Sequence, residues 1–167
     1  MDLLVNPDQR LNPARTGSPK GLEMAHDTGK QCVFCSGSEE KFVRRNDLAY
    51  AIWDGFPVTS LHALIIPNRH VPDLFDLSEE ETLACYQLLA EMRREIHAVD
   101  SLVQGFNIGV NIGLVAGQTI LHCHIHLIPR RARDVDNPQG GVRHIFPGKG
   151  NYLECAESNS TPGAASD

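Results

Sequence analysis

The pattern of apolar and polar positions along the chain predicts several short strands and one long helix. Short runs that are apolar, or that alternate between apolar and polar residues, are typical of β-strands when turn residues bound them. Such runs occupy 41–45, 48–53, 62–67, 105–111 and 119–129. The first two are predicted to form a hairpin that turns at Asn46-Asp47, since Asn and Asp favour turns.

The helix is predicted to begin at a capping box, Ser78-Glu-Glu-Glu81, and to end near Val99. A Ser followed three residues later by Glu satisfies backbone N–H groups at a helix start. The predicted apolar stripe consists of Leu83, Tyr86, Leu89, Met92 or the stem of Arg93, and Ile96. Together these elements predict an α+β fold, in which an antiparallel sheet of about five strands carries one long helix on a face.

The sequence predicts one domain between two extensions. The chain has 167 residues, enough for a single domain with a sizeable core. Residues 1–30 lack periodicity and are punctuated by Pro and Gly, so we expect a flexible extension, in which Met24 is a candidate alternative start. Residues 31–155 are expected to form the domain, and 156–167, rich in Ser, Gly and Ala, a disordered tail.

Charge and cysteine content narrow the class of protein. A formal net charge of −6 argues against a nucleic-acid binder, which would carry a basic stripe. No apolar run reaches membrane-spanning length and no signal peptide is evident, so we expect no membrane partner. The five cysteines are an odd number, and Cys85, Cys123 and Cys155 stand alone, which suits a reducing cytoplasm rather than a disulfide framework.

The segment after residue 121 is the basic part of this acidic chain. Its cations are Arg130, Arg131, Arg133, Arg143 and Lys149. They are candidates for attracting an anionic substrate, although a solvated basic face is an equally good interpretation for each arginine taken singly. The turn-rich stretch 140–150 is expected either to lie over the far end of the substrate or to pack as a C-terminal loop.

Three histidines in the predicted strand 119–129 carry the strongest chemical signal. His122, His124 and His126 occupy every second position, so on a strand their imidazoles would share one face. Because a strand rises about 3.3 Å per residue, the outer two would lie roughly 13 Å apart, too far for all three to bind one metal. Besides a row of structural histidines, the pattern favours a division of roles among attack, anion binding and support or metal binding. A neutral imidazole, with a pKa of about 6.5, is a competent nucleophile near pH 7.

The run His122-Cys-His124-Ile-His126-Leu-Ile resembles the His-Φ-His-Φ-His-Φ-Φ signature of the histidine triad (HIT) family, where Φ is apolar. Blocks at 61–70 and 105–119 are also similar to that family, and the resemblance covers residues 32–131. It implies the α+β HIT meander and a homodimer whose sheet continues across the interface. The context around the triad is closer to the fragile-histidine-triad and bacterial zinc-containing branch than to the phosphoramidase branch.

The resemblance also implies roles for individual residues. His124 attacks the α-phosphorus of a nucleotide and forms a nucleotidyl-imidazole that is resolved later, so one hard displacement becomes two easier ones. A backbone carbonyl within the run fixes its tautomer, and His126 contacts phosphate oxygens. Gln118 reaches the phosphate and leaving group, and Thr119 is the adjacent hydroxyl. The plain alternative for these two is an ordinary polar residue at a strand end.

Three further positions match the family upstream of the triad. Asn111 lies near the phosphate and ribose, and His62 orients the triad; the family more often has Gly at the preceding position, where this chain has Leu61. Asp54 resembles the acid that binds ribose hydroxyls, although an Asp-Gly pair is also a good turn. Candidates for the walls of the base pocket are Phe34, Ile52 and Trp53.

The spacing Cys32-Val-Phe-Cys35 is half of a tetrahedral zinc site or a redox pair. A redox pair would be expected to open a helix in a βαβ context, which this pattern lacks. The resemblance implies a structural zinc completed by His70 and His122, which would leave His124 for the attack. The alternatives are reduced thiols and a surface histidine.

These observations predict a nucleotidyl hydrolase or transferase. The expected substrate is a purine, adenosine-based phosphoanhydride such as a dinucleoside polyphosphate, or a phosphoramidate, and Mg²⁺ is a candidate companion of a polyphosphate. The alternatives are a phosphorylase that uses phosphate as acceptor, a nucleotide-binding module without catalysis, and a zinc protein whose histidines are all ligands.

Overall fold

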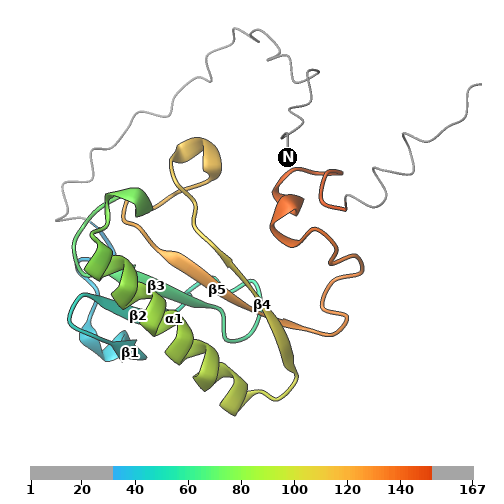
Figure 1. Cartoon of the computed structure of the whole chain (residues 1–167), viewed down its shortest axis with the longest axis horizontal. Coiled ribbons are helices and arrows are strands. Elements are labelled where there is room, and N and C mark those ends of the chain that lie inside the picture. Colours follow the sequence, from blue (N-terminus) through green and yellow to red (C-terminus); the bar gives the residue numbers. More distant parts are fainter. Residues whose placement is uncertain (1–31, 152–167) are drawn as a thin grey trace, which may run out of the picture.

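The computed structural model describes residues 32–151, and the predicted extension 1–30, with Met24, and tail 156–167 lie outside this range. A single sheet contains β1 (Arg44–Arg45), β2 (Ala49–Trp53), β3 (Ala63–Pro67), β4 (Val103–Gly109) and β5 (Ile125–Arg131). The strand order is β1-β2-β3-β5-β4, and every neighbouring pair is antiparallel. The helix α1 (Glu79–Val99) lies across one face, which confirms the predicted α+β fold (Figure 1).

Short 3-10 turns complete the connections: η1 (Glu39–Lys41), η2 (Leu74–Asp76), η3 (Leu114–Ala116) and η4 (Gly141–Ile145). The last of these, η4, contacts β4, so part of the stretch 140–150 packs against the sheet as a loop (Figure 1). Within the described range, we find no helix with the length and apolarity needed to cross a membrane.

The helix begins at the predicted capping box, in which the Ser78 hydroxyl accepts from the Glu81 amide and the Glu81 carboxylate accepts from the Ser78 amide. Its buried apolar positions are Ala84, Cys85, Leu88, Met92 and Ile96. The predicted stripe is therefore wrong at Leu83 and Tyr86, which are exposed. The buried helix residues pack in one cluster with Ala49, Ala51 and Ala63 of the sheet, together with Ile65 and Leu127.

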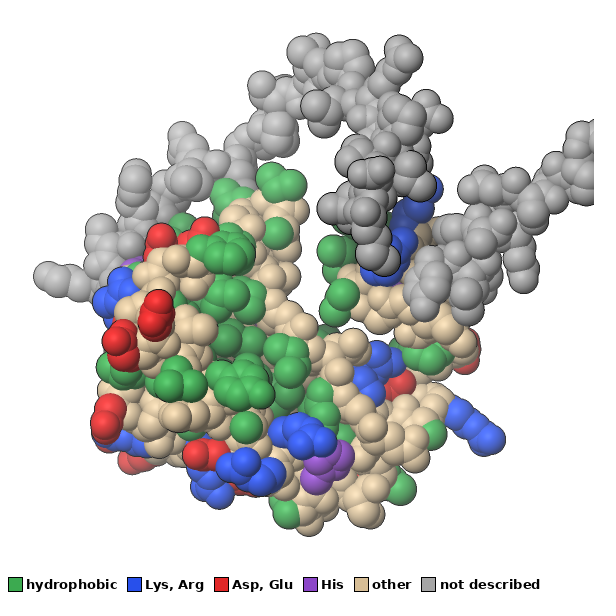
Figure 2. Space-filling model, in the orientation of Figure 1, with side chains coloured by type: hydrophobic (Ala, Val, Ile, Leu, Met, Phe, Trp, Pro, Cys, Tyr) green, Lys and Arg blue, Asp and Glu red, His purple; other side chains and the backbone are tan. Residues whose placement is uncertain are grey.

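Of the predicted stripe, Tyr86 and Leu89 line a groove. It has a volume of about 710 Å³ and runs between α1 and β4, with Tyr86, Leu89, Phe106 and Ile108 among its walls. Figure 2 shows hydrophobic side chains gathered on this face. Since β4 ends the sheet, the groove lies along a sheet edge.

The two faces of the sheet bury different clusters. Alternate strand residues such as Ile65 and Leu127 face α1, whereas Leu64 and Ile66 pack on the opposite face with Cys32, Phe34 and Tyr50. The β3–β5 register sets Leu64 opposite His126. Because paired residues point to the same side of a sheet, His126 projects from the face opposite α1.

The predicted strand 119–129 is wrong in its first half, since β5 begins only at Ile125. His122 and His124 precede the strand, and the Cys123 amide donates to the carbonyl of Val71 in a loop. β3 pairs with β5 only over 63–65, and within the described range residues 119–124 are not paired with a strand. Buried and partly buried positions alternate only from Ile125 to Pro129, within the strand, whereas His122, Cys123 and His124 are all buried.

Leu61, which precedes β3, adopts a φ of 65°. This left-handed conformation costs a residue with a Cβ about 1–2 kcal/mol, and it explains why glycine suits this position. Leu61 also packs against the core, so its side chain contributes burial while its backbone is strained.

We expect Leu61→Gly to be more stable than Leu61→Ala by about 0.5–1 kcal/mol, the reverse of the usual order, because only Gly relieves the positive φ. Urea denaturation of both variants measures the difference. Leu77 packs against the same core at a φ of −71° and is the control: there Ala should be the more stable replacement. An Ala preference at both positions would contradict the strain.

Candidate functional site

The site lies where three neighbouring strands bring their ends together on the face opposite α1. Asp54 follows the last residue of β2, and His62 precedes β3, directly across the β2–β3 pairing. His126 is the second residue of β5 and pairs with β3. The sheet order therefore gathers residues that are up to 72 positions apart in sequence.

His124 is buried and its protonation is set by the backbone. Its Nδ1 lies 2.7 Å from the carbonyl oxygen of His122. A carbonyl only accepts hydrogen bonds, so Nδ1 carries the proton and Nε2 keeps its lone pair. This is the arrangement that an imidazole nucleophile needs, and the acceptor lies within the histidine run.

His62 and His126 form a chain with Asp54. Asp54 Oδ2 lies 3.1 Å from His62 Nδ1, and His62 Nε2 lies 3.0 Å from His126 Nδ1. His126 Nε2 is a buried atom for which the described residues provide no hydrogen-bond partner. The chain therefore ends in a polar atom beside the ring of His124, whose centroid is 5.1 Å from that of His126.

Burial keeps the imidazoles of His62 and His126 uncharged. Desolvation first, and then the neighbouring His124 and His62, lower the pKa of His126 to about 4, against the opposing effect of Asp54. Desolvation also lowers the pKa of His62, again opposed by Asp54. Both rings are therefore neutral near pH 7.

A second cluster contains the four predicted metal ligands, Cys32, Cys35, His70 and His122. Their ligand atoms all lie within 4.8 Å of one another. Sulfur–nitrogen distances are 3.2 Å from Cys35 to His70 and 3.5 Å from each cysteine to His122. Zn–S and Zn–N bonds in a tetrahedral site give an edge of about 3.5 Å, so this donor set is compatible with zinc.

The His122 ring is oriented for this cluster. Its Nε2 lies 2.9 Å from the Pro67 carbonyl oxygen and donates to it, so Nδ1 presents its lone pair toward the two sulfurs. Metal-binding histidines commonly donate their second nitrogen to a backbone carbonyl. His122 therefore belongs to the cysteine cluster and not to the group of His62, His124 and His126.

Phe34 lies between the two clusters. Its ring contacts His122 and His124 edge-on, with centroids 5.8 and 5.2 Å apart. The Tyr50 hydroxyl donates to the Phe34 carbonyl and fixes the segment that carries both cysteines. Through these two contacts, Phe34 packs against one histidine of each cluster.

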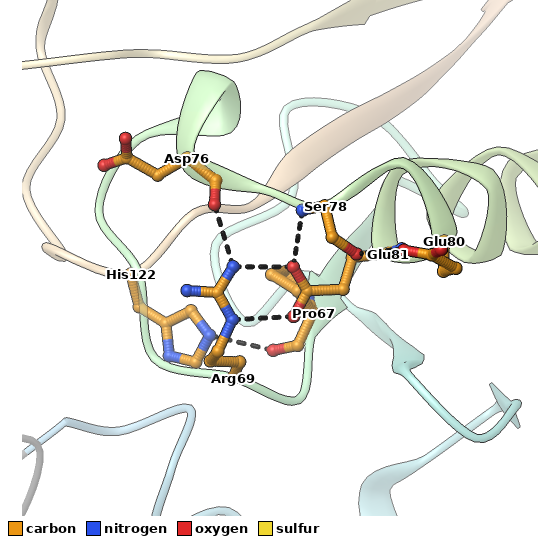
Figure 3. A network of polar contacts seen from close by, with 7 residues as sticks. All are labelled: Pro67, Arg69, Asp76, Ser78, Glu80, Glu81 and His122. Carbon is orange, nitrogen blue, oxygen red and sulfur yellow. Dashed lines mark hydrogen bonds and ion pairs between the residues drawn. The ribbon is translucent and has the colours of Figure 1, made fainter.

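An ion-pair network supports the cluster of Cys32, Cys35, His70 and His122 from the helix side (Figure 3). The Arg69 guanidinium donates to both oxygens of Glu81 at 2.8 and 2.6 Å, and it also donates to the Asp76 carbonyl. Arg69 precedes His70, so the network ties the turn bearing that ligand to the start of α1. The sequence signalled the capping role of Glu81 but not this second use, which depends on a contact across the fold.

The remaining predicted nucleotide contacts are less directly placed. The buried Gln118 amide is bonded at both ends, accepting from the Gly113 amide and donating to the Pro72 carbonyl, each at 2.8 Å. Asn111 is half-buried and Thr119 is exposed. Among residues 32–151, the structure records no hydrogen bond between either residue and a histidine of the site.

Two of the arginines expected to attract an anion, Arg130 and Arg131, bind acidic and polar side chains instead. Arg130 pairs with Asp134 and donates to Asn107, while Arg131 pairs with Asp100 and donates to Thr59. These contacts brace the end of β5, so the structure favours the structural interpretation for both.

The described residues contain one further group of possible metal ligands, Asp54, His62 and His126, but opposite nitrogens of His62 face its two neighbours. A hydrogen-bonded chain fits this geometry, and Mg²⁺ gains no support. Burial raises the pKa of Cys85 to about 12 and of Cys123 to about 11, which makes these thiols unreactive.

Comparison with known proteins places this geometry in context. The HIT domain family matches residues 36–133. The bis(5'-nucleosyl)-tetraphosphatase (asymmetrical) of Schizosaccharomyces pombe is 37% identical over 90 residues, which cover 54% of this chain and 49% of that protein. Adenylylsulfatase HINT3 of Arabidopsis thaliana is 33% identical over 135 residues, 77% of this chain and 68% of that protein. A zinc-bound histidine triad family protein from Mycobacterium smegmatis superposes with a TM-score of 0.58 at 30% identity, covering 64% of this chain and 79% of that one.

We expect Glu81→Gln to lower the free energy of unfolding at pH 7 by about 1–2 kcal/mol, because the charge-assisted bonds to Arg69 are lost. Arg69 and then the Ser78 amide lower the pKa of Glu81 from 4.5 to about 2. The lowered pKa stabilises the fold above pH 4.5, and this contribution is lost as the pH falls toward 2.

Urea denaturation across this pH range tests the prediction: the deficit of Glu81→Gln should shrink as the pH falls. Glu79→Gln removes the same charge from the exposed first turn and is the control. An equal deficit at pH 7 and at pH 2.5 would show that the ion pair is not its origin.

Proposed function

Because the chain belongs to the HIT family, we propose that it is a nucleotidyl hydrolase or transferase with a covalent nucleotidyl-histidine intermediate. Its proposed substrates are adenosine-based phosphoanhydrides, such as dinucleoside polyphosphates, or phosphoramidates. The observation that carries this proposal is the 2.7 Å contact of His124 Nδ1 with a backbone carbonyl, which leaves Nε2 as a nucleophile.

The proposed reaction has two displacements at one phosphorus atom. The Nε2 lone pair of His124 attacks the α-phosphorus, a P–N bond forms, and the bond from phosphorus to the leaving group breaks. Water or another acceptor then attacks the same phosphorus, and the P–N bond returns its electrons to Nε2. Phosphate as the acceptor would make the protein a phosphorylase.

His126 is proposed to contact the substrate phosphate. Its Nε2 is buried, lies at the end of the Asp54 chain and has a nearby nucleophile in His124. A buried polar atom is costly to leave unpaired, so a phosphate oxygen or the group it carries is a fitting partner. His62 is proposed to hold His126 in this orientation.

The nucleoside is proposed to lie between Asp54 and Phe34. Asp54 Oδ1 already accepts from the Phe56 amide, which fixes the carboxylate, and Oδ2 points to the site. Phe34 offers an aromatic edge beside His124, and Ile52 and Trp53 are proposed to extend the base pocket. Asn111 and Thr119 are proposed phosphate and ribose contacts, and Gln118 is proposed to act from the braced position that the loop gives it.

We also propose that Cys32, Cys35, His70 and His122 hold a structural zinc ion. The support is the match of their spacing to a tetrahedral site and the orientation of His122 by Pro67. Four protein ligands leave no open position, so the metal would stabilise the histidine run rather than bind substrate.

A homodimer through β4 is a further proposal. β4 ends the sheet, and edge strands offer backbone groups to a second chain. The apolar groove beside it, with exposed Ile108 and Tyr86, would be covered by a second copy. The cytoplasmic location suggested by the cysteine pattern also remains a proposal.

We expect wild-type protein, mixed briefly with diadenosine polyphosphate or adenosine phosphoramidate and quenched, to carry one nucleotidyl group by intact-protein mass spectrometry. His124→Asn should carry none and should lose turnover by at least about a thousandfold, because no nucleophile remains. His97→Asn, on the helix away from the site, is the matched control and should keep the adduct. A protein that binds AMP with neither adduct nor turnover would favour the non-catalytic binding module.

The zinc proposal predicts one equivalent of zinc per chain by elemental analysis of protein purified without chelator. Cys35→Ser should lose most of this zinc and lower the unfolding temperature by at least about 5 °C, because metal binding stabilises the fold. Cys155→Ser should keep both. Zinc-free wild-type protein with an unchanged unfolding temperature on zinc addition would contradict the proposal.

A further inference from the structure

The number of protons shared along the chain Asp54–His62–His126 follows from its contacts. It contains two contacts between facing polar atoms, here called gaps, that one proton each can fill. One runs from the Asp54 carboxylate to His62 Nδ1 at 3.1 Å, and the other from His62 Nε2 to His126 Nδ1 at 3.0 Å. Two neutral imidazoles carry two N–H protons. When the site is empty, these two protons fill the two gaps, and His126 Nε2 has a bare lone pair.

One contact competes with this assignment. The Val58 amide donates toward His62 Nδ1 at 3.4 Å, which would require a lone pair on that nitrogen. This distance is long for an N–H donor, whereas the Asp54 carboxylate is nearer and charged. A lone pair facing a carboxylate at 3.1 Å would be repulsive, and a proton there makes a charge-assisted interaction. The proton therefore belongs on Nδ1.

A phosphate bound at His126 Nε2 adds a third gap. Anionic oxygens would then face both ends of the chain, Asp54 at one end and the phosphate at the other. Three gaps between acceptors need three protons, and the two neutral rings supply only two. The missing proton must come from solvent.

We propose that Asp54 is a positioning residue that fixes the protons of the His62–His126 pair, so that binding of a substrate phosphate takes up one proton. This inference rests on the proposed function, since it assumes that the phosphate lies at His126. It deepens that function by providing the N–H that a departing oxygen or nitrogen needs, at the moment when a phosphate is present.

The groups around His62 and His126 agree with two protons in the empty site and three when phosphate is bound. The groups that face His126 are His124, His62 and Asp54, and burial together with the two histidines disfavours a cation there. The empty site therefore holds the neutral pair. A bound phosphate supplies the negative charge that stabilises the additional proton.

Asp54→Asn changes the count without removing the side chain. The amide can donate to His62 Nδ1, toward which the Val58 amide also points, and both rings then place their protons on Nε2. The neutral pair would already present an N–H to the phosphate, so the third proton is not required. The variant thus separates the role of Asp54 in the proton chain from loss of the fold.

The first test uses the empty full-length protein with ¹⁵N-labelled histidine, whose ring nitrogen shifts distinguish protonated from bare nitrogens. At pH 7.5 we expect Nδ1–H on both His62 and His126 in wild type, and Nε2–H on both in Asp54→Asn. Asp47→Asn removes the same charge from an exposed turn and should match wild type. Nε2–H on His62 of wild type, or the same tautomers in wild type and Asp54→Asn, would overturn the role of Asp54.

The second test measures proton uptake by calorimetry of AMP binding in buffers of different ionisation enthalpy. At pH 7.5, where most AMP is already dianionic, wild type and Asp47→Asn should take up between about half and one proton, and Asp54→Asn close to none. The ligand 2′,3′-dideoxyadenosine 5′-monophosphate should give the same uptake, because it lacks the ribose hydroxyls that Asp54 would otherwise bind.

The outcomes separate this inference from the proposed function. Binding without proton uptake in wild type, or equal uptake in Asp54→Asn, would overturn the inference while leaving nucleotide binding intact. Absence of binding by both nucleotides would overturn the proposed function together with proton uptake, whereas the NMR result on the empty protein decides the role of Asp54 independently.

Discussion

The antiparallel pairing of β3 with β5 sets the geometry of the whole site. Its register places His126 opposite Leu64, on the face away from α1, and the start of β3 beside it brings in His62. The adjacent β2–β3 pairing adds Asp54 at the neighbouring strand end. A shift of one residue in β5 would turn His126 into the alanine-rich helix interface, because strand side chains alternate between faces. The chemistry therefore depends on the same register that closes the core.

The histidine run divides between two environments because it enters the sheet only at Ile125. Before that point the backbone follows a loop, so His122 can turn to Pro67 and the cysteines while its own carbonyl accepts from His124. A continuous strand would have used that carbonyl in the ladder or directed it elsewhere. The departure from regular structure thus lets one short segment contribute to both clusters, the proposed metal ligands and the proposed nucleophile.

Buried polar groups in this site are held by neighbours that fix their protons. The Pro67 and His122 carbonyls assign the tautomers of two imidazoles, and the ion pair of Arg69 with Glu81 secures the turn between them and the helix. The strained backbone at Leu61 lies next to His62, where the core contact of its side chain offsets the conformational cost. The fold accepts local strain at the point where it positions a ring.

The sequence by itself determined the fold class and the capping box at Ser78, because short-range periodicity and residue chemistry are local properties. Its resemblance to the HIT family named the candidate groups of the two clusters, including the four candidate metal ligands, since motif spacing does not depend on exact backbone paths. Only the tertiary structure decided where β5 begins, that Leu83 and Tyr86 face outward, and that Arg130 and Arg131 are engaged by acids. Those outcomes depend on which distant segment supplies a hydrogen-bond acceptor, a small-residue surface or a counter-charge, and no local pattern in the sequence contains that information.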